Sequence, residues 1–203
     1  MMNWLAHLLL AEDNPESRLG NLLGDLVKGV ERKSLAPSLQ RGLQCHQAID
    51  IFTDKHLIVK RSKKRINEKY RRYAGILIDV FYDYILANHW QDYSDIPLTK
   101  FTTTVYASWA DQLDYLPAYA QGVIRRLIAE DWLSSSSSLE GIEYTLRRIS
   151  WKLSRRRNRQ FDLTPAKQEL TRNYAELEQD FQQFFPQLIL YIDNWHQNLR
   201  SEN

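Results

Sequence analysis

The spacing of the apolar residues constrains the fold more than any other feature of this sequence. Along most of the 203 residues, apolar side chains recur every three or four positions and rarely alternate. That period places them on one face of a helix, whereas strict alternation would indicate half-buried strands. Only seven glycines and six prolines interrupt the pattern. We therefore expect an all-α fold, a helical bundle formed by residues 1–203 as a single domain, which is long enough to bury a core.

Cysteine content and hydropathy bear on the compartment. Cys45 is the only cysteine, so the chain cannot form an internal disulfide. The N-terminal residues lack the basic flank and small-residue cleavage site of a secretory signal. The longest apolar runs fall far short of a membrane span. These features predict a soluble cytoplasmic protein with no membrane partner.

Cap and turn signals set several helix boundaries. Asn14 followed by Pro15 should begin a helix that ends near Gly29. A further helix should run from about Ser38 through residue 56, and another should cross the basic residues that follow and continue to residue 90.

Two later signals concern the second half of the chain. Ser137 and Glu140 match the spacing of a capping box at a helix start. Thr164 and Pro165 should begin a last long helix, which Pro186 should kink or break because proline lacks an N–H donor.

The stretch "CHQAIDIFTDKH" at residues 45–56 carries two histidines and two aspartates. His46 and Asp50 are four positions apart, so on a helix they are neighbours on one face and can share a ligand. Asp54 continues the same row. The pattern fits half of a metal site, and it equally fits a histidine paired with an aspartate at a helix edge.

A second pair of acidic residues lies in an apolar segment, where burying a charge costs free energy. Between Tyr73 and His89 the only formally charged residues are Asp79 and Asp83, in a segment that is apolar or aromatic nearly all round. A buried, unpaired carboxylate costs several kcal/mol unless a cation, a proton or strong donors compensate it. Two accounts stay open. One is a salt bridge to an arginine of the nearby basic run, and the other is a divalent metal shared with His46 and Asp50.

Two further residues are ambiguous by themselves. His7, within "LAHLLL", places an imidazole in an apolar helix, where it is more often a core residue than a ligand. Asp25 projects away from the leucine stripe of its own helix and could simply be solvated.

Two basic runs stand out although the net charge is only +2. Residues 60–72 hold eight bases and one acid, and residues 147–159 hold seven bases and no acid. Each run could be a solvated helix face, but two together favour an acidic partner, either nucleic acid or an acidic protein.

Four motifs, in order, resemble the acyl carrier protein phosphodiesterase family. They are "NWLAHLLLA", "GNLLGDLVKG", "HQAIDIFTDKH" and "RRYAGILIDVFYDYILANHW", with a looser echo in "LRRISWKLSRRRNR". Members are similar to HD-type metal-dependent phosphohydrolases, helical proteins whose histidine and aspartate ligands come from separate helices. The resemblance implies hydrolysis of the phosphodiester between 4'-phosphopantetheine and a serine of holo acyl carrier protein. It also implies a role in fatty acid biosynthesis.

The resemblance also implies roles for particular residues. The metal ligands would be His7, Asp25, His46, Asp50 and Asp79, which carry oxygen and imidazole donors suited to Mn²⁺ or Mg²⁺. Asp54 or Asp83 would act as general base, and Asp83 would lie either among the metal ligands or directly behind them. The residues expected to bind the acidic carrier protein are Arg61, Lys64, Arg65, Arg71, Arg72, Arg155, Arg156 and Arg157. The chain departs from the family's common histidine at Leu9 and its common arginine at Gln47.

Two other functions compete with this one. An HD-type hydrolase acting on a nucleotide such as an alarmone would use the same metal site. A non-catalytic helical module would bind nucleic acid through the two basic runs. The second leaves Asp79 and Asp83 unexplained, so nucleic acid is the less favoured partner.

Overall fold

The computed structural model describes residues 4–201, and in these residues it contains helices and no strand. The expectation of an all-α protein is confirmed. The α-helices are α1 (Trp4–Leu10), α2 (Pro15–Leu26), α3 (Gly29–Ser34), α4 (Pro37–Lys55), α5 (Leu57–Arg65), α6 (Ala74–Asn88), α7 (Leu98–Ser108), α8 (Ala118–Ala129), α9 (Leu139–Arg157), α10 (Lys167–Arg172) and α11 (Tyr174–Ser201). Short 3₁₀ turns join several of them, among them η1 (Glu68–Tyr73).

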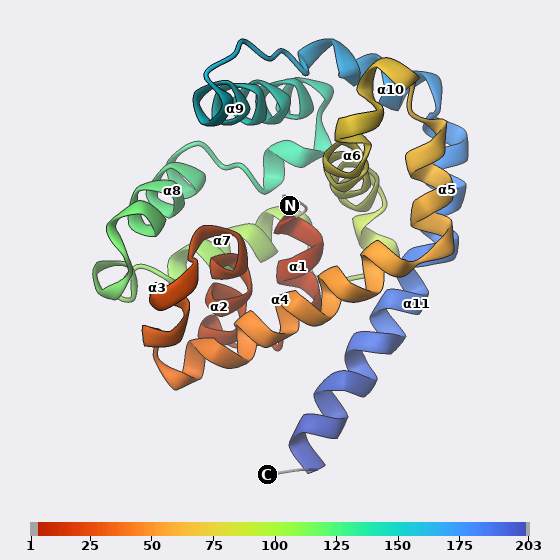
Figure 1. The fold of residues 1–203 in the computed structure, drawn as a ribbon. Helices are drawn as coiled ribbons and strands as arrows, with labels where there is room; N and C mark the ends of the chain where they lie inside the picture. The colour runs from red at the N-terminus through yellow and green to blue at the C-terminus, as the bar shows by residue number, and fades with distance from the viewer. Residues whose placement is uncertain (1–3, 202–203) are drawn as a thin grey trace.

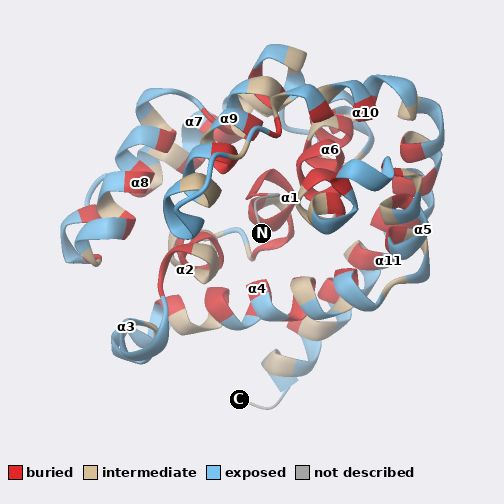
Figure 2. Cartoon of the chain, turned by 45° about the horizontal axis from the view of Figure 1, so that its top comes forward, coloured by how far each residue is buried: buried red, intermediate tan, exposed pale blue. Residues whose placement is uncertain are grey.

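The short helix α1 lies at the centre of the fold, with α2, α4 and α6 packed near it (Figure 1). Both α1 and α6 are buried on nearly every side, whereas α3 is exposed (Figure 2). The long helix α11 runs along α5 and α4. One hydrophobic core joins these elements and extends from Trp4 to Ile192. None of the described helices is both long and apolar enough to cross a membrane.

Several predicted boundaries hold, and others shift for local reasons. Asn14 caps α2 as expected, because its side chain accepts a hydrogen bond from the backbone N–H of Ser17 at 2.7 Å. The cap of α9 is Ser138 rather than Ser137, since the Ser138 hydroxyl accepts from the N–H of Gly141. Helix α11 continues through Pro186, so the expected break does not occur there.

The basic run does not form one helix with the segment after it. Helix α5 ends at Arg65, and Ile66 is extended with φ −69° and ψ 133°. The side chain of Asn67 then accepts a hydrogen bond from the N–H of Lys69 and caps η1. Because side chains of asparagine compete for backbone donors, Asn67 favours a new start over a continuous helix. Helix α6 therefore begins separately at Ala74.

Candidate metal centre

Glycines bring α2 and α4 unusually close together. A Cβ atom on Gly20 would lie 2.2 Å from a backbone carbonyl of α4, and one on Gly42 would lie 2.2 Å from a backbone carbonyl of α2. Both distances are too short for any side chain, so the two backbones meet directly. This crossing brings Asp25, near the end of α2, toward His46 in the middle of α4.

Gly24 makes room for one imidazole. A Cβ atom at this position would lie 2.3 Å from Cγ of His46, inside van der Waals contact. The ring of His46 thus occupies the space that a side chain at position 24 would need. Any larger residue there would displace the ring.

His7, His46 and Asp50 form a tight cluster. One ligand atom from each lies within 4.8 Å of the other two. Nε2 of His7 is 3.5 Å from one Asp50 carboxylate oxygen, and Nε2 of His46 is 3.3 Å from the other. The two imidazole rings stack with centroids 4.3 Å apart. Residues 39 positions apart in the sequence therefore point their donor atoms at one carboxylate.

Asn21 orients the ring of His7. The side-chain oxygen of Asn21 lies 2.8 Å from Nδ1 of His7, and both side chains are buried. In this orientation an amide oxygen can only accept, so Nδ1 donates and carries the ring proton. Nε2 of His7 faces Asp50: it can donate to the carboxylate when the ring is protonated, and it offers a lone pair to a cation when the ring is neutral. In metal-binding histidines, an acceptor bound to the ring nitrogen that does not ligate the metal fixes the tautomer in the same way.

Asp50 is held in its charged form. Burial alone would raise the pKa of its carboxyl group, but hydrogen bonds from His46 and His7 outweigh burial and lower the pKa below its usual range. The side chain is 29% exposed, so the cluster has an opening at Asp50.

Asp25 and Asp79 border the cluster. Asp25 accepts a hydrogen bond from Nε1 of Trp4 at 3.0 Å, and its other oxygen is 4.0 Å from Nε2 of His46. Asp79 is buried, and its Oδ2 atom has no hydrogen-bond partner. Burial raises the pKa of Asp79 to about 7, and the negative charge of Asp50 adds to this effect. Among residues 4–201, no arginine lies within ion-pair distance of Asp79.

Asp83 binds the N-terminus of α1 rather than the cluster. Its two carboxylate oxygens accept the backbone N–H groups of Leu5 and Ala6 at 3.0 and 3.1 Å. A carboxylate at this place satisfies donors that the first turn of α1 leaves open. Burial nevertheless raises the pKa of Asp83 to about 8. The geometry therefore makes Asp83 the anchor of α1 on α6, and its expected role as a general base or ligand stays a prediction.

The donor set suits a divalent cation. Metal–ligand bonds of roughly 2.1 Å place neighbouring ligand atoms about 3 Å apart, close to the 3.3 and 3.5 Å separations between Asp50 and the two histidines. Two imidazoles and one to three carboxylates match manganese, iron or zinc, and magnesium with more water. The buried Oδ2 of Asp79, which lacks a donor, fits a neighbouring cation.

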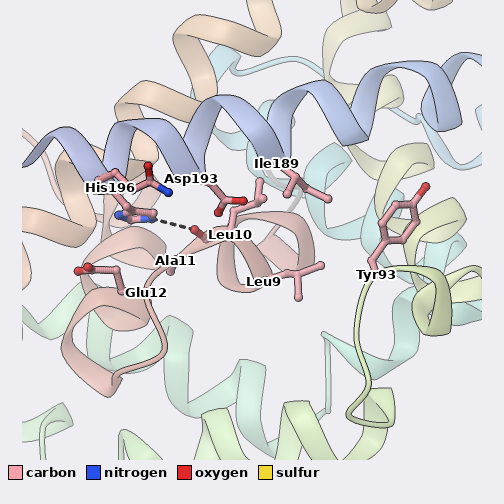
Figure 3. Close-up of a pocket in the computed structure, with 9 residues that line it drawn as sticks. Leu9, Leu10, Ala11, Glu12, Tyr93, Ile189, Asp193 and His196 are labelled. Atoms are coloured by element: carbon pink, nitrogen blue, oxygen red, sulfur yellow. Dashed lines mark hydrogen bonds between the residues drawn. The ribbon is translucent and has the colours of Figure 1, made fainter.

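A separate pocket lies between α1 and α11 (Figure 3). Leu9, Tyr93 and Ile189 line it on one side. Positions 7 and 9 are about 200° apart around a helix, so a histidine at position 9 would not join His7 and His46. At the other end, Nε2 of His196 lies 3.1 Å from the carbonyl oxygen of Leu10.

The basic residues expected to bind a partner fall into two groups. Arg61 and Arg65 form ion pairs with the buried Asp180 at 2.6 and 2.9 Å, so they stabilise the contact between α5 and α11. Arg61 is also 47% exposed, and the expected part of both arginines in binding a partner stays a prediction. The other expected residues are exposed as well: Lys64, Arg71, Arg72, Arg155, Arg156 and Arg157.

Known proteins match this chain over most of its length. A family model described as acyl carrier protein phosphodiesterase matches residues 2–188. The chain belongs to this family. Proteins named acyl carrier protein phosphodiesterase from Serratia proteamaculans (strain 568) and Pectobacterium atrosepticum are 33% and 32% identical to it, each over 93% of this chain and 96% of the relative. One from Escherichia coli O157:H7 is 32% identical over the same shares.

Membership in this family confirms the resemblance drawn from the four motifs, and with it the expectation of an enzyme. No solved structure matches the chain, so the likeness to the HD-type fold stays a prediction. Sequence reasoning missed Asn21 and Gly24, although both lie in the motif "GNLLGDLVKG". The signal was the spacing of Gly20 and Gly24, which places two small residues on one face of a helix.

Proposed function

We propose that this protein hydrolyses the phosphodiester bond between 4'-phosphopantetheine and the serine of holo acyl carrier protein, releasing apo carrier protein. The convergence of His7, His46 and Asp50 from two separate motifs of the family carries the proposal. Relatives that are 32–33% identical to the chain bear the name acyl carrier protein phosphodiesterase. The whole chain, residues 1–203, acts as one catalytic domain.

The residues of the cluster would hold a divalent metal, Mn²⁺ or Mg²⁺ by preference. His7, His46 and Asp50 would be ligands, with Asp25 and Asp79 completing the set. A metal bound there would supply a hydroxide at neutral pH and polarise the phosphoryl oxygen. Asn21 would keep Nε2 of His7 available as a donor atom, and Gly24 would keep the ring of His46 in place.

Of the two predicted general bases, Asp54 is the one that keeps an accessible carboxylate. It lies one helical turn after Asp50 on α4, and it is 53% exposed. Asp83 cannot take this role while both of its oxygens bind the N-terminus of α1. We therefore assign proton transfer from the attacking water to Asp54.

The exposed basic residues would receive the acidic carrier protein. The end of α9 carries three consecutive arginines, Arg155, Arg156 and Arg157, with no acid beside them. The exposed ring of Trp151 lies under the guanidinium of Arg155, 4.9 Å from it. Complementary charge at such a surface raises the rate of encounter more than the final affinity.

We also propose a cytoplasmic location and a role in fatty acid biosynthesis. A single cysteine supports this location, because proteins of oxidising compartments usually carry paired cysteines. The thiol of Cys45 is buried, and burial raises its pKa to about 12, so it would stay protonated and unreactive.

Mass spectrometry tests the proposed reaction. The protein is incubated with holo acyl carrier protein and Mn²⁺, and loss of the phosphopantetheine mass from the carrier protein is expected. A chelator should stop the reaction, and added Mn²⁺ should restore it. A panel of nucleotides under the same conditions is the control. Turnover of a nucleotide with intact holo carrier protein would contradict the proposal.

A further inference from the structure

Lys63 occupies a defined place that its basic neighbours on α5 do not share. Its Nζ donates to Oδ1 of Asp54 at 3.1 Å. Its aliphatic chain passes over Gly75, because a Cβ atom on Gly75 would lie 3.6 Å from Cε and 3.8 Å from Nζ of Lys63. Arg61 and Arg65, two positions before and after it, bind Asp180 instead. Helix α5 thus directs Lys63 toward α4 and α6.

Both helices that Lys63 contacts, α4 and α6, also carry residues of the metal cluster or its border. Asp54 follows Asp50 by four residues on α4, and Gly75 precedes Asp79 by four residues on α6. Residues four apart on a helix are neighbours on one face, roughly 6 Å from each other. Lys63 therefore contacts α4 and α6 one helical turn from the positions of Asp50 and Asp79. Its positive charge acts on Asp79 against the effect of burial, as expected for close groups.

The ammonium group can exchange its partner. Lys63 is 26% exposed and Asp54 is 53% exposed, so water reaches the ion pair. Exposed ion pairs of this kind contribute little to stability, so releasing Asp54 costs little. A lysine ammonium has three donors on a flexible stem and is a common phosphate ligand. The other residues of the cluster are carboxylates and imidazoles, so none of them is a permanently charged donor for the anionic oxygens of a phosphate.

We propose that Lys63 is a phosphate-binding residue of this site, which leaves Asp54 and donates to a non-bridging oxygen of a phosphate held at the His7–His46–Asp50 cluster. The inference rests on the proposed function, because it places the substrate's phosphodiester beside the cluster.

Calorimetry with inorganic phosphate tests the inference directly. Wild-type protein loaded with Mn²⁺ is titrated with phosphate and compared with Lys63→Ala, Lys63→Arg and Lys55→Ala. We expect Lys63→Ala to weaken phosphate binding about tenfold or more, and Lys63→Arg to retain part of the affinity because it keeps the charge. Lys55 is an exposed lysine next to Asp54 and serves as the matched control. Lys55→Ala should bind phosphate like the wild type, and all four proteins should bind Mn²⁺ with equal affinity.

Two outcomes would overturn the inference. One is phosphate affinity that Lys63→Ala leaves unchanged, or that the wild type lacks. The other is a parallel loss of Mn²⁺ and phosphate binding in Lys63→Ala, which would make Lys63 part of the scaffold. Phosphate binding that depends on Lys63, in a protein that leaves holo carrier protein intact, would support the inference and contradict the proposed substrate. For a small phosphodiester such as bis(4-nitrophenyl) phosphate, Lys63→Ala should raise KM about tenfold.

Discussion

Two buried carboxylates, Asp79 on α6 and Asp180 on α11, have opposite surroundings. Asp180 is fully buried and receives donors from Arg61, Arg65 and Ser62, which lower its pKa although burial raises it. Asp79 is 3% exposed, its Oδ2 has no partner, and burial raises its pKa to about 7. The chain thus compensates one buried acid with its own arginines and leaves the other with an unpaired oxygen, which fits the metal that we propose.

The comparison decides between two explanations for the acids of α6. A salt bridge to the basic run was one of them, and α5 does supply two arginines to a buried aspartate. That aspartate is Asp180, which lies more than a hundred residues away in the sequence. Asp83 is satisfied by backbone donors of α1. Of these three aspartates, only Asp79 has a carboxylate oxygen without a hydrogen-bond partner among the described residues, and it lies next to the histidine cluster.

The largest effect should follow from removing a cluster residue. We expect His46→Ala and Asp79→Ala each to lower the hydrolysis of holo carrier protein by about 1,000-fold, the scale of losing a main electrostatic group. Both variants should keep the helical circular dichroism spectrum. Asp79→Ala should melt no lower than the wild type without metal, because the cost of desolvating the carboxylate disappears. An unfolded Asp79→Ala protein would show that Asp79 has a structural partner.

Asp180→Ala should show the reverse pattern. It leaves two arginines and a buried serine hydroxyl without their acceptor, so we expect the free energy of unfolding to fall by about 3 kcal/mol. For a chain of this size that corresponds to roughly 6 to 12 °C in Tm. Activity per folded molecule should stay near that of the wild type. If Asp180→Ala lost activity but not stability, Asp180 would belong to the active site like Asp79, and the two acids would not have different roles.

How much of this could be predicted from the sequence depends on the range of the interaction. The helical period fixed the fold class, and the four-residue spacing placed His46 and Asp50 on one face, because both are local properties of a helix. The apolar surroundings of Asp79 and Asp83 predicted that both are buried. Which of them is compensated depends on contacts 77 and 78 residues apart between α1 and α6, which no local pattern encodes.

A smaller effect should come from the residue that orients His7. Asn21→Ala removes the acceptor for Nδ1 of His7 and frees the ring to change tautomer. We expect Mn²⁺ affinity, measured by calorimetry, to fall 10- to 100-fold, as for other residues that hydrogen-bond to a metal ligand. Asn21→Asp keeps an acceptor and should retain most of the affinity. If Asn21→Ala binds Mn²⁺ like the wild type, His7 is not a ligand that needs orientation.

The pH dependence of stability should differ in sign between the two acids. The carboxyl of folded Asp79 keeps its proton up to about pH 7, whereas an unfolded aspartate releases it near pH 4. Unfolding therefore becomes easier as pH rises through this window, and Asp79→Asn should remove roughly 1 to 2 kcal/mol of that loss in metal-free protein. Asp180, with its lowered pKa, stabilises the fold above about pH 4 and loses this effect as pH falls. Urea titrations at pH 5 and 7.5 measure the difference for Asp79, and titrations at pH 5 and 3 measure the difference for Asp180.

The smallest effect concerns basic residues that have no internal acid to bind. Arg61 and Arg65 form ion pairs with Asp180, whereas Arg156 and Arg157 are exposed at the end of α9 and no ion pair is found for them among the described residues. If they attract the acidic carrier protein, the double variant Arg156→Glu with Arg157→Glu should lower kcat/KM for holo carrier protein several-fold. The loss should shrink as salt increases, because exposed charges are screened beyond roughly 8 Å at physiological ionic strength. Turnover of a small phosphodiester, which needs only the cluster, should stay within twofold. A double variant that loses both activities together would assign these arginines to the fold or to the active site rather than to docking.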